Sequence, residues 1–141
     1  MRRIDKIIVH CSAGNINNSA ADIVSFHTRP VKNGGRGWTT PGYHYFVEKT
    51  GKVVNIVPEE RISNGVAGFN AHAINVCYAG GVDQRTFSIP EDTRTPQQKE
   101  ALVDLLKTLR VKYPNARIYG HRDFAPKACP SFNAKQEYQD L

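Results

Sequence analysis

Short apolar runs that alternate with helical patterns constrain the fold of this chain more than any other feature of its sequence. Three runs are typical of strands, because they are short and rich in apolar or β-branched side chains: Lys6–Cys11, Ile74–Ala79 and Arg117–Gly120. Two further runs flank a turn that contains a glycine and predict a β-hairpin: Gly42–Glu48 and Lys52–Val57.

Two segments between these runs begin with side chains that cap helices. Ser19 is followed three residues later by Asp22, and Thr95 is followed by a proline and then by Gln98. Both patterns are typical of a capping box at the start of a helix. After the second cap, leucines follow at helical spacing: Leu102, Leu105, Leu106 and Leu109. We also predict a short amphipathic helix over Asn133–Leu141.

The length and composition of the chain fit one folded domain. The chain has 141 residues, of which 40% are hydrophobic and 23% charged. This composition is globular rather than disordered. Because strands and helices alternate, we predict a single domain over residues 1–141, of the α/β class, with a mixed β-sheet. No stretch approaches the about 20 apolar residues of a membrane span, and no apolar run near the start is long enough for a signal peptide.

The charge of the chain suits an anionic partner. The formal net charge is +6 at pH 7, which fits nucleic acid, an anionic cell envelope or acidic peptides, and is also explained by solubility alone. Lysine and arginine are scattered along the chain, without a run of five or more. This pattern argues against nucleic acid as the main partner.

Three side chains that can bind zinc lie close to predicted strands. His10 lies at the end of the first strand, His121 follows the last one, and Cys129 lies eight residues further on. If the two strands are neighbours, both imidazoles lie at one edge of the sheet, and the loop can return the cysteine to them. Two histidines and a cysteine form a zinc set with an open fourth position, which is typical of catalytic zinc. Spacing alone leaves Cys11 and Cys77 as alternative sulfur ligands, although both are expected in the core.

Three segments of the chain resemble a known family of enzymes. They are IVHCSA at residues 8–13, GYHYFV at Gly42–Val47 and GHRDFAPKACPSF at Gly120–Phe132. In this order they resemble the zinc-dependent N-acetylmuramoyl-L-alanine amidases, in the group of bacteriophage T7 lysozyme, which is related to the peptidoglycan recognition proteins. The resemblance covers almost the whole chain, and its third segment is the most specific.

The resemblance implies a central mixed β-sheet flanked by helices, with one Zn²⁺ per chain in a groove at one edge. It implies that His10, His121 and Cys129 bind the zinc, and that Tyr43 and Lys127 are catalytic. The implied reaction is hydrolysis of the amide between the lactyl group of N-acetylmuramic acid and L-alanine. Such a reaction needs an activated water and stabilisation of the oxyanion, which the lysine charge and the tyrosine hydroxyl can assist.

Two further side chains are candidates for substrate contacts. Trp38 follows a glycine-rich loop, where its ring can stack on a sugar or anchor the loop, and His72 lies in the loop before a strand. The sequence departs from the family in the loop Asn64–Asn70, where many relatives carry a histidine and this chain has none before its second glycine. This departure concerns the substrate contacts of that loop and leaves the zinc set intact.

The resemblance also implies a partner and a place of action. We expect peptidoglycan or its muropeptides as the substrate, and a monomeric protein. Without a predicted signal peptide, we expect synthesis in the cytoplasm and access to the cell wall through holin-type or other non-classical release, as for a phage or prophage endolysin. The alternative is a recognition module of the same fold that binds muropeptides with little turnover. The complete ligand set favours the enzyme, because recognition proteins without catalysis typically lack the cysteine.

Overall fold

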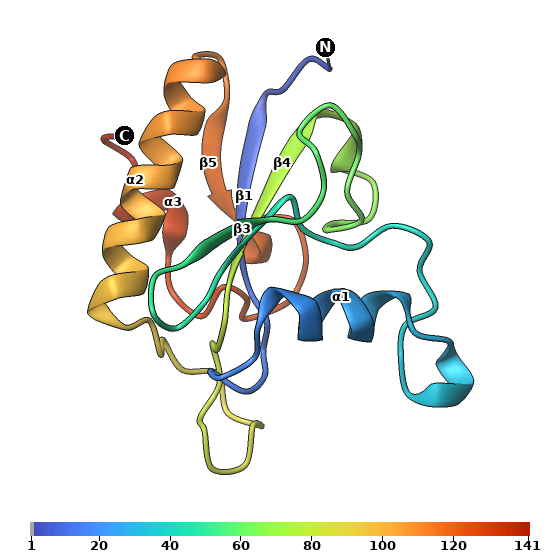
Figure 1. The fold of residues 1–141 in the computed structure, drawn as a ribbon. Coiled ribbons are helices and arrows are strands. Elements are labelled where there is room, and N and C mark those ends of the chain that lie inside the picture. The colour runs from blue at the N-terminus through green and yellow to red at the C-terminus, as the bar shows by residue number, and fades with distance from the viewer. Residues whose placement is uncertain (1) are drawn as a thin grey trace.

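A five-stranded sheet forms the centre of the computed structural model, which describes residues 2–141 (Figure 1). The strands are β1 (Lys6–Cys11), β2 (Tyr45–Val47), β3 (Val53–Asn55), β4 (Ala73–Tyr78) and β5 (Arg117–Gly120). Their order across the sheet is β3-β2-β4-β1-β5. All neighbours are parallel except the β2–β3 pair, which is antiparallel. The predicted mixed sheet is confirmed, and β1 and β5 are neighbours.

Helices cover both faces of this sheet (Figure 1). They are α1 (Ala20–Thr28), α2 (Pro96–Lys112) and α3 (Ala134–Glu137), with 3₁₀ turns η1 (Val31–Asn33), η2 (Asn70–His72) and η3 (His121–Asp123). Helices α2 and α3 pack on the face that receives Ile7, Val9 and Cys11 of β1. Helix α1 packs on the opposite face. Because side chains alternate along a strand, His10 lies on the α1 face. No helix among residues 2–141 combines the length and apolar character that a membrane crossing requires.

Local signals in the sequence explain where the two longer helices begin. The Ser19 side chain accepts the Asp22 backbone N–H, and the Asp22 carboxylate accepts the Ser19 N–H. Thr95 and Gln98 form the same reciprocal pair at the start of α2. Each side chain satisfies a backbone donor that has no partner within its helix. Both predicted capping boxes are therefore confirmed.

Three elements, β2, β3 and α3, are shorter than the sequence predicts. The hairpin strands contain three residues each, because their pairing continues only through single hydrogen bonds, such as that from the Ile56 N–H to the His44 carbonyl at 2.7 Å. Helix α3 ends at Glu137, where the predicted helix extends to Leu141. A helix of one turn has little stability of its own, so α3 depends on the packing of Ala134 and Tyr138 in the core.

A buried arginine ties the segment before α2 to the last part of the chain. The Arg94 guanidinium lies 2.8 Å from the Asp92 carboxylate and 2.6 Å from that of Glu137. It also lies 3.4 Å from the centre of the Phe132 ring. Burial raises the pKa of Asp92, but the hydrogen bonds and charge of Arg94 outweigh burial and lower it. The same guanidinium lowers the pKa of Glu137. Arg94 thereby anchors the segment that follows Cys129.

We expect Arg94→Met to lower the free energy of unfolding by about 1–3 kcal/mol near neutral pH. Breaking a fully buried pair costs about 3–5 kcal/mol, but the Asp92 and Glu137 side chains are 32% and 44% exposed, so solvent screens part of the effect. Because Arg94 lowers both carboxyl pKa values, the pairs stabilise the fold above the unfolded-state pKa of about 4, and this contribution is lost as the pH falls through the folded-state values.

Urea unfolding of both proteins at several pH values measures this effect. The difference between wild type and Arg94→Met should shrink as the pH is lowered from about 7 towards about 2. A difference that stays constant over this range would show that Arg94 acts through packing on Phe132 instead of through its ion pairs.

Candidate metal centre and active-site groove

A groove with a volume of about 550 Å³ opens at the carboxyl ends of β1 and β5, on the face that α1 covers. Its walls come from the end of β1, from α1, from the loop around Trp38, from residues 64–67 and from the segment 121–129. A second hollow of about 410 Å³ continues from this groove along α1, because Ser12 and Phe26 line both. Segments that are distant in sequence therefore meet along one extended surface.

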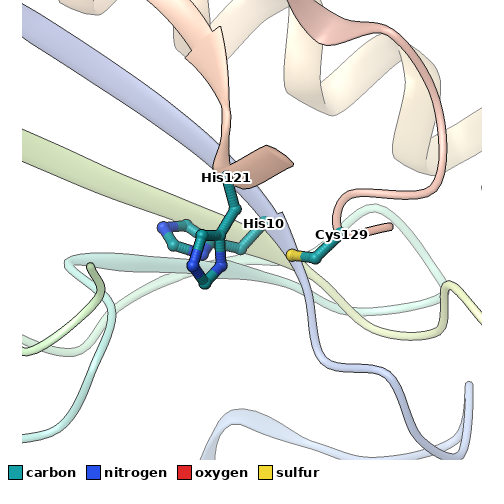
Figure 2. Close-up of side chains that lie close together, drawn as sticks. All are labelled: His10, His121 and Cys129. Atoms are coloured by element: carbon teal, nitrogen blue, oxygen red, sulfur yellow. The ribbon is translucent and has the colours of Figure 1, made fainter. Parts of the chain in front are cut away.

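The three predicted zinc-binding side chains converge in this groove (Figure 2). The possible ligand atoms of His10, His121 and Cys129 all lie within 4.8 Å of one another. His10 comes from the end of β1, His121 begins η3 directly after β5, and Cys129 follows from the next loop. Since β1 and β5 are parallel neighbours, their ends meet at the same edge of the sheet. The structure thus brings together the residues that the sequence pattern selects.

Hydrogen bonds fix the loop that carries Cys129. The Cys11 backbone N–H donates to the Cys129 Sγ atom at 3.1 Å. The Arg122 N–H donates to the Cys129 carbonyl at 2.8 Å, and the Tyr78 hydroxyl donates to the Pro130 carbonyl at 2.6 Å. The sulfur is therefore held against the end of β1 rather than on a free loop.

Burial sets the charge of the two histidines in this cluster. Burial, together with the charge of His121, lowers the pKa of His10 to about 3. Burial and the nearby Lys127 ammonium also lower the pKa of His121. Both imidazoles are thus neutral near pH 7, and neutral imidazole is the form that binds metal ions.

The donor set fits a zinc ion. The hydrogen bond with the Cys11 side chain and burial raise the pKa of the Cys129 thiol, so a cation must displace its proton before the sulfur can bind. Two imidazole nitrogens and one sulfur are ligands that Zn²⁺ accepts, and three protein ligands leave a fourth position for water or substrate. The proximity of the three ligand atoms is consistent with one ion among them.

Both predicted catalytic residues line the same groove. The ring of Tyr43 lies 5.1 Å from that of His10 and 5.2 Å from that of His27, measured between centroids. Burial raises the pKa of Tyr43 well above its ordinary value, so its hydroxyl keeps its proton near pH 7 and can donate a hydrogen bond. Lys127 is exposed at the groove, and its charge acts on His121.

Aromatic and cationic side chains line another part of the groove. The Trp38 ring lies 4.8 Å from that of His27 and 5.2 Å from the Arg36 guanidinium. The His27 Nδ1 atom accepts the Gly42 backbone N–H at 3.0 Å. Trp38 therefore packs on the protein and also lines the groove, and its contact with a sugar stays a prediction.

The structure places His72 away from this groove. His72 ends η2, directly before the amino end of β4, and its Nδ1 atom lies 2.9 Å from the Arg3 carbonyl. Strand β4 runs parallel to β1, so its amino end lies opposite the edge that carries His10. The structure therefore does not bring His72 together with the other candidates. Asp123 accepts the Gly120 N–H at 2.8 Å and caps η3.

Comparison with known proteins identifies the family. The sequence matches the N-acetylmuramoyl-L-alanine amidase family over residues 1–132. The chain belongs to this family. The amidase is 36% identical to the endolysin of Enterobacteria phage K11, over 93% of this chain and 83% of that protein. It is 34% identical to the endolysin of Escherichia phage T7, over 96% of this chain and 85% of that protein. The resemblance stated from the sequence is therefore confirmed.

Solved structures agree with this assignment. The Ph2119 endolysin from a Thermus scotoductus bacteriophage superimposes on the amidase with a TM-score of 0.78 at 28% identity, over 92% of this chain and 79% of that one. Drosophila PGRP-LB matches with a TM-score of 0.76 at 18% identity, over 100% and 82% of the two chains, and shows a shared fold. The amidase is thus a cell-wall hydrolase whose fold is that of the peptidoglycan recognition proteins.

Two buried polar residues of the amidase, of which the first contacts His10 and the second contacts the first, were not predicted from the sequence. They are Asn75 on β4 and Ser63 in the loop that precedes η2, and both are completely buried. Asn75 faces the same side of the sheet as His10, because it pairs in register with Ile8. An asparagine inside an otherwise apolar strand is the signal that could have revealed it, because a buried amide needs hydrogen-bond partners.

Proposed function

We propose that the amidase cleaves peptidoglycan with one Zn²⁺ ion bound by His10, His121 and Cys129. The convergence of these donors in one groove, beside Tyr43 and Lys127, carries the proposal. When bound, Zn²⁺ lowers the pKa of a water molecule and polarises a carbonyl oxygen. These are the two requirements for hydrolysis of the amide between N-acetylmuramic acid and L-alanine.

The residues of the groove supply the remaining chemistry in this proposal. The Tyr43 hydroxyl keeps its proton and can donate a hydrogen bond to the carbonyl oxygen of the substrate. The Lys127 ammonium places a positive charge where negative charge develops on that oxygen, which stabilises the transition state more than the ground state. The neutral imidazoles of His10 and His121 keep their lone pairs available as ligands.

The shape and charge of the groove suit a segment of peptidoglycan. The Trp38 ring offers an apolar face on which a sugar ring can stack, and the hollow along α1 extends the surface beyond the metal cluster. The net charge of +6 favours an anionic cell wall. All proposed site residues come from one chain, so a monomer is sufficient. We further propose holin-type release to the wall, as expected of an endolysin.

Digestion of purified peptidoglycan tests this function. We expect released peptides that begin with L-alanine, detected by mass spectrometry, together with about one zinc per chain by elemental analysis. A chelator should abolish the release, and added Zn²⁺ should restore it. Stoichiometric zinc without cleavage of several wall types would favour a recognition module. Cleavage without zinc, or neither zinc nor cleavage, would refute the proposed ligand set.

A further inference from the structure

We propose that Asn75 is a positioning residue of the metal centre, whose amide fixes the tautomer of His10 and leaves Nδ1 of that histidine free for the metal. The inference rests on the proposed function, in which His10 is a ligand. The Asn75 Oδ1 atom lies 2.8 Å from the His10 Nε2 atom, and the two residues are 0% and 1% exposed. Which of these atoms carries the proton follows from the groups around them.

The assignment begins at His44, one residue after the candidate Tyr43. The Asn75 backbone N–H donates to the His44 Nδ1 atom at 3.0 Å. A backbone amide is always a donor, so this nitrogen must be an acceptor. Burial lowers the pKa of His44 to about 4, so the ring is neutral and Nε2 carries its one proton. That proton is donated to the Arg61 carbonyl at 2.8 Å.

The opposite tautomer of His44 satisfies fewer groups. It would let Nε2 accept from the Arg2 guanidinium at 3.1 Å, but it would oppose the Asn75 N–H with a second donor and leave the Arg61 carbonyl without this partner. The guanidinium has other acceptors, including the Glu59 carbonyl at 2.9 Å. We therefore assign the proton of His44 to Nε2.

Ser63 transmits this assignment to the Asn75 side chain. The Ser63 hydroxyl lies 3.1 Å from the His44 Nδ1 atom, which has no proton, so the hydroxyl must donate to it. Its oxygen is then free to accept the Asn75 Nδ2 group at 2.8 Å. The Asn70 Oδ1 atom lies on the same side, 3.4 Å from Nδ2. It accepts two backbone N–H groups, those of Gly65 and Val66, which identifies it as oxygen.

The orientation of the Asn75 amide then determines the tautomer of His10. Because acceptors surround the NH₂ group of Asn75, its oxygen must face His10. The His10 Nε2 atom is therefore a donor and carries the proton of the neutral ring. The lone pair of His10 is consequently on Nδ1, the ring nitrogen that this hydrogen bond leaves free.

A glycine makes room for this arrangement. A Cβ atom at Gly65 would lie 2.4 Å from the Asn75 Cγ atom, which is too close for any side chain. Gly65 belongs to the loop in which this chain lacks the histidine of many relatives. In this amidase the space beside that loop is occupied by the Asn75 amide. Gly65→Ala should therefore displace Asn75 without changing any of the proposed zinc ligands or either proposed catalytic residue.

Nitrogen NMR of the metal-free amidase measures the tautomer directly. Long-range ¹H–¹⁵N correlation near pH 7 should show the His10 proton on Nε2 in the wild type. In Asn75→Ala we expect a mixture of tautomers and a zinc affinity lowered about 10–100-fold, the usual effect of losing an outer-shell partner. Competition with a chromogenic chelator measures that affinity. Asn75→Asp retains the acceptor that faces His10 and should retain the tautomer, but its second oxygen would oppose the acceptors of Ser63 and Asn70, so we expect it to lose stability.

Gln98→Ala is the matched control. Gln98 is also completely buried, and its amide donates to the carbonyls of Val47 and Ala79, away from the groove. We expect this variant to lose stability but to keep the His10 tautomer and the zinc affinity. The same changes in Gln98→Ala as in Asn75→Ala would show that Asn75 acts only through stability.

Three results would overturn the inference. The first is a wild-type His10 with its proton on Nδ1, a measurement that needs neither zinc nor a folded variant. The second is an unchanged zinc affinity in folded Asn75→Ala, and the third is an unchanged affinity in Gly65→Ala with Asn75 displaced. If the wild type binds no zinc while its proton is on Nε2, the proposed function fails and the tautomer assignment stands.

Discussion

Replacing Cys129 with alanine should abolish peptidoglycan hydrolysis. The sulfur lies within 4.8 Å of the ligand atoms of His10 and His121, and it is one of three proposed protein ligands. Loss of an outer-shell partner lowers metal affinity or activity about 10–100-fold. Loss of a direct ligand should cost more, and we expect a decrease in kcat/KM of about 10³-fold or greater. Elemental analysis of zinc and mass spectrometry of the released peptides measure both effects.

Cys77→Ala provides the control for this variant. Cys77 is also a free cysteine, but it lies on β4, completely buried against α1, and does not line the groove. We expect that variant to lose some stability through the small cavity it creates, and to keep its zinc. Full activity of Cys129→Ala with bound zinc would remove Cys129 from the ligand set. Cys11 would then be the next sulfur to test, because it lies against the same loop.

The parts of the fold that local chemistry determines could be predicted from the sequence. Strands β1 and β5 have the predicted bounds, because each is a short run that ends at a change in composition. Helices α1 and α2 begin at the predicted caps, because a capping box involves residues only three apart. The order of the strands depends on contacts between distant segments, and no local signal in the sequence fixes it.

In the candidate site, too, local signals could be predicted from the sequence, and contacts between distant segments could not. The convergence of His10, His121 and Cys129 required β1 and β5 to be neighbours, which the sequence could state only as a condition. His72 was a candidate because it lies in a loop, but the parallel direction of β4 places that loop at the opposite end of the sheet. Asn75 was missed because it lies within an apolar run. The hydrophobic pattern of such a run predicts a buried strand, but it gives no role to a single polar side chain inside it.

Lys127→Ala should retain zinc but lose most of the turnover. Lys127 lines the groove beside His121 without belonging to the cluster of ligand atoms. Its charge is therefore expected to act on the oxyanion of the transition state rather than on metal binding. Removing one such stabilising group typically lowers kcat about 10²–10³-fold. Steady-state digestion of a soluble muropeptide, with zinc measured on the same sample, separates a loss of kcat from a loss of metal.

Two further variants distinguish the position of this charge from its mere presence. Lys135→Ala removes an exposed lysine on α3, outside the groove, and should leave kcat unchanged. Lys127→Arg keeps the charge but changes its shape and hydrogen-bonding geometry, so it should recover only part of the turnover. If Lys127→Ala retains full turnover, the Tyr43 hydroxyl remains as the protein donor proposed for the oxyanion. If it loses zinc as well, Lys127 supports the metal centre instead of the transition state.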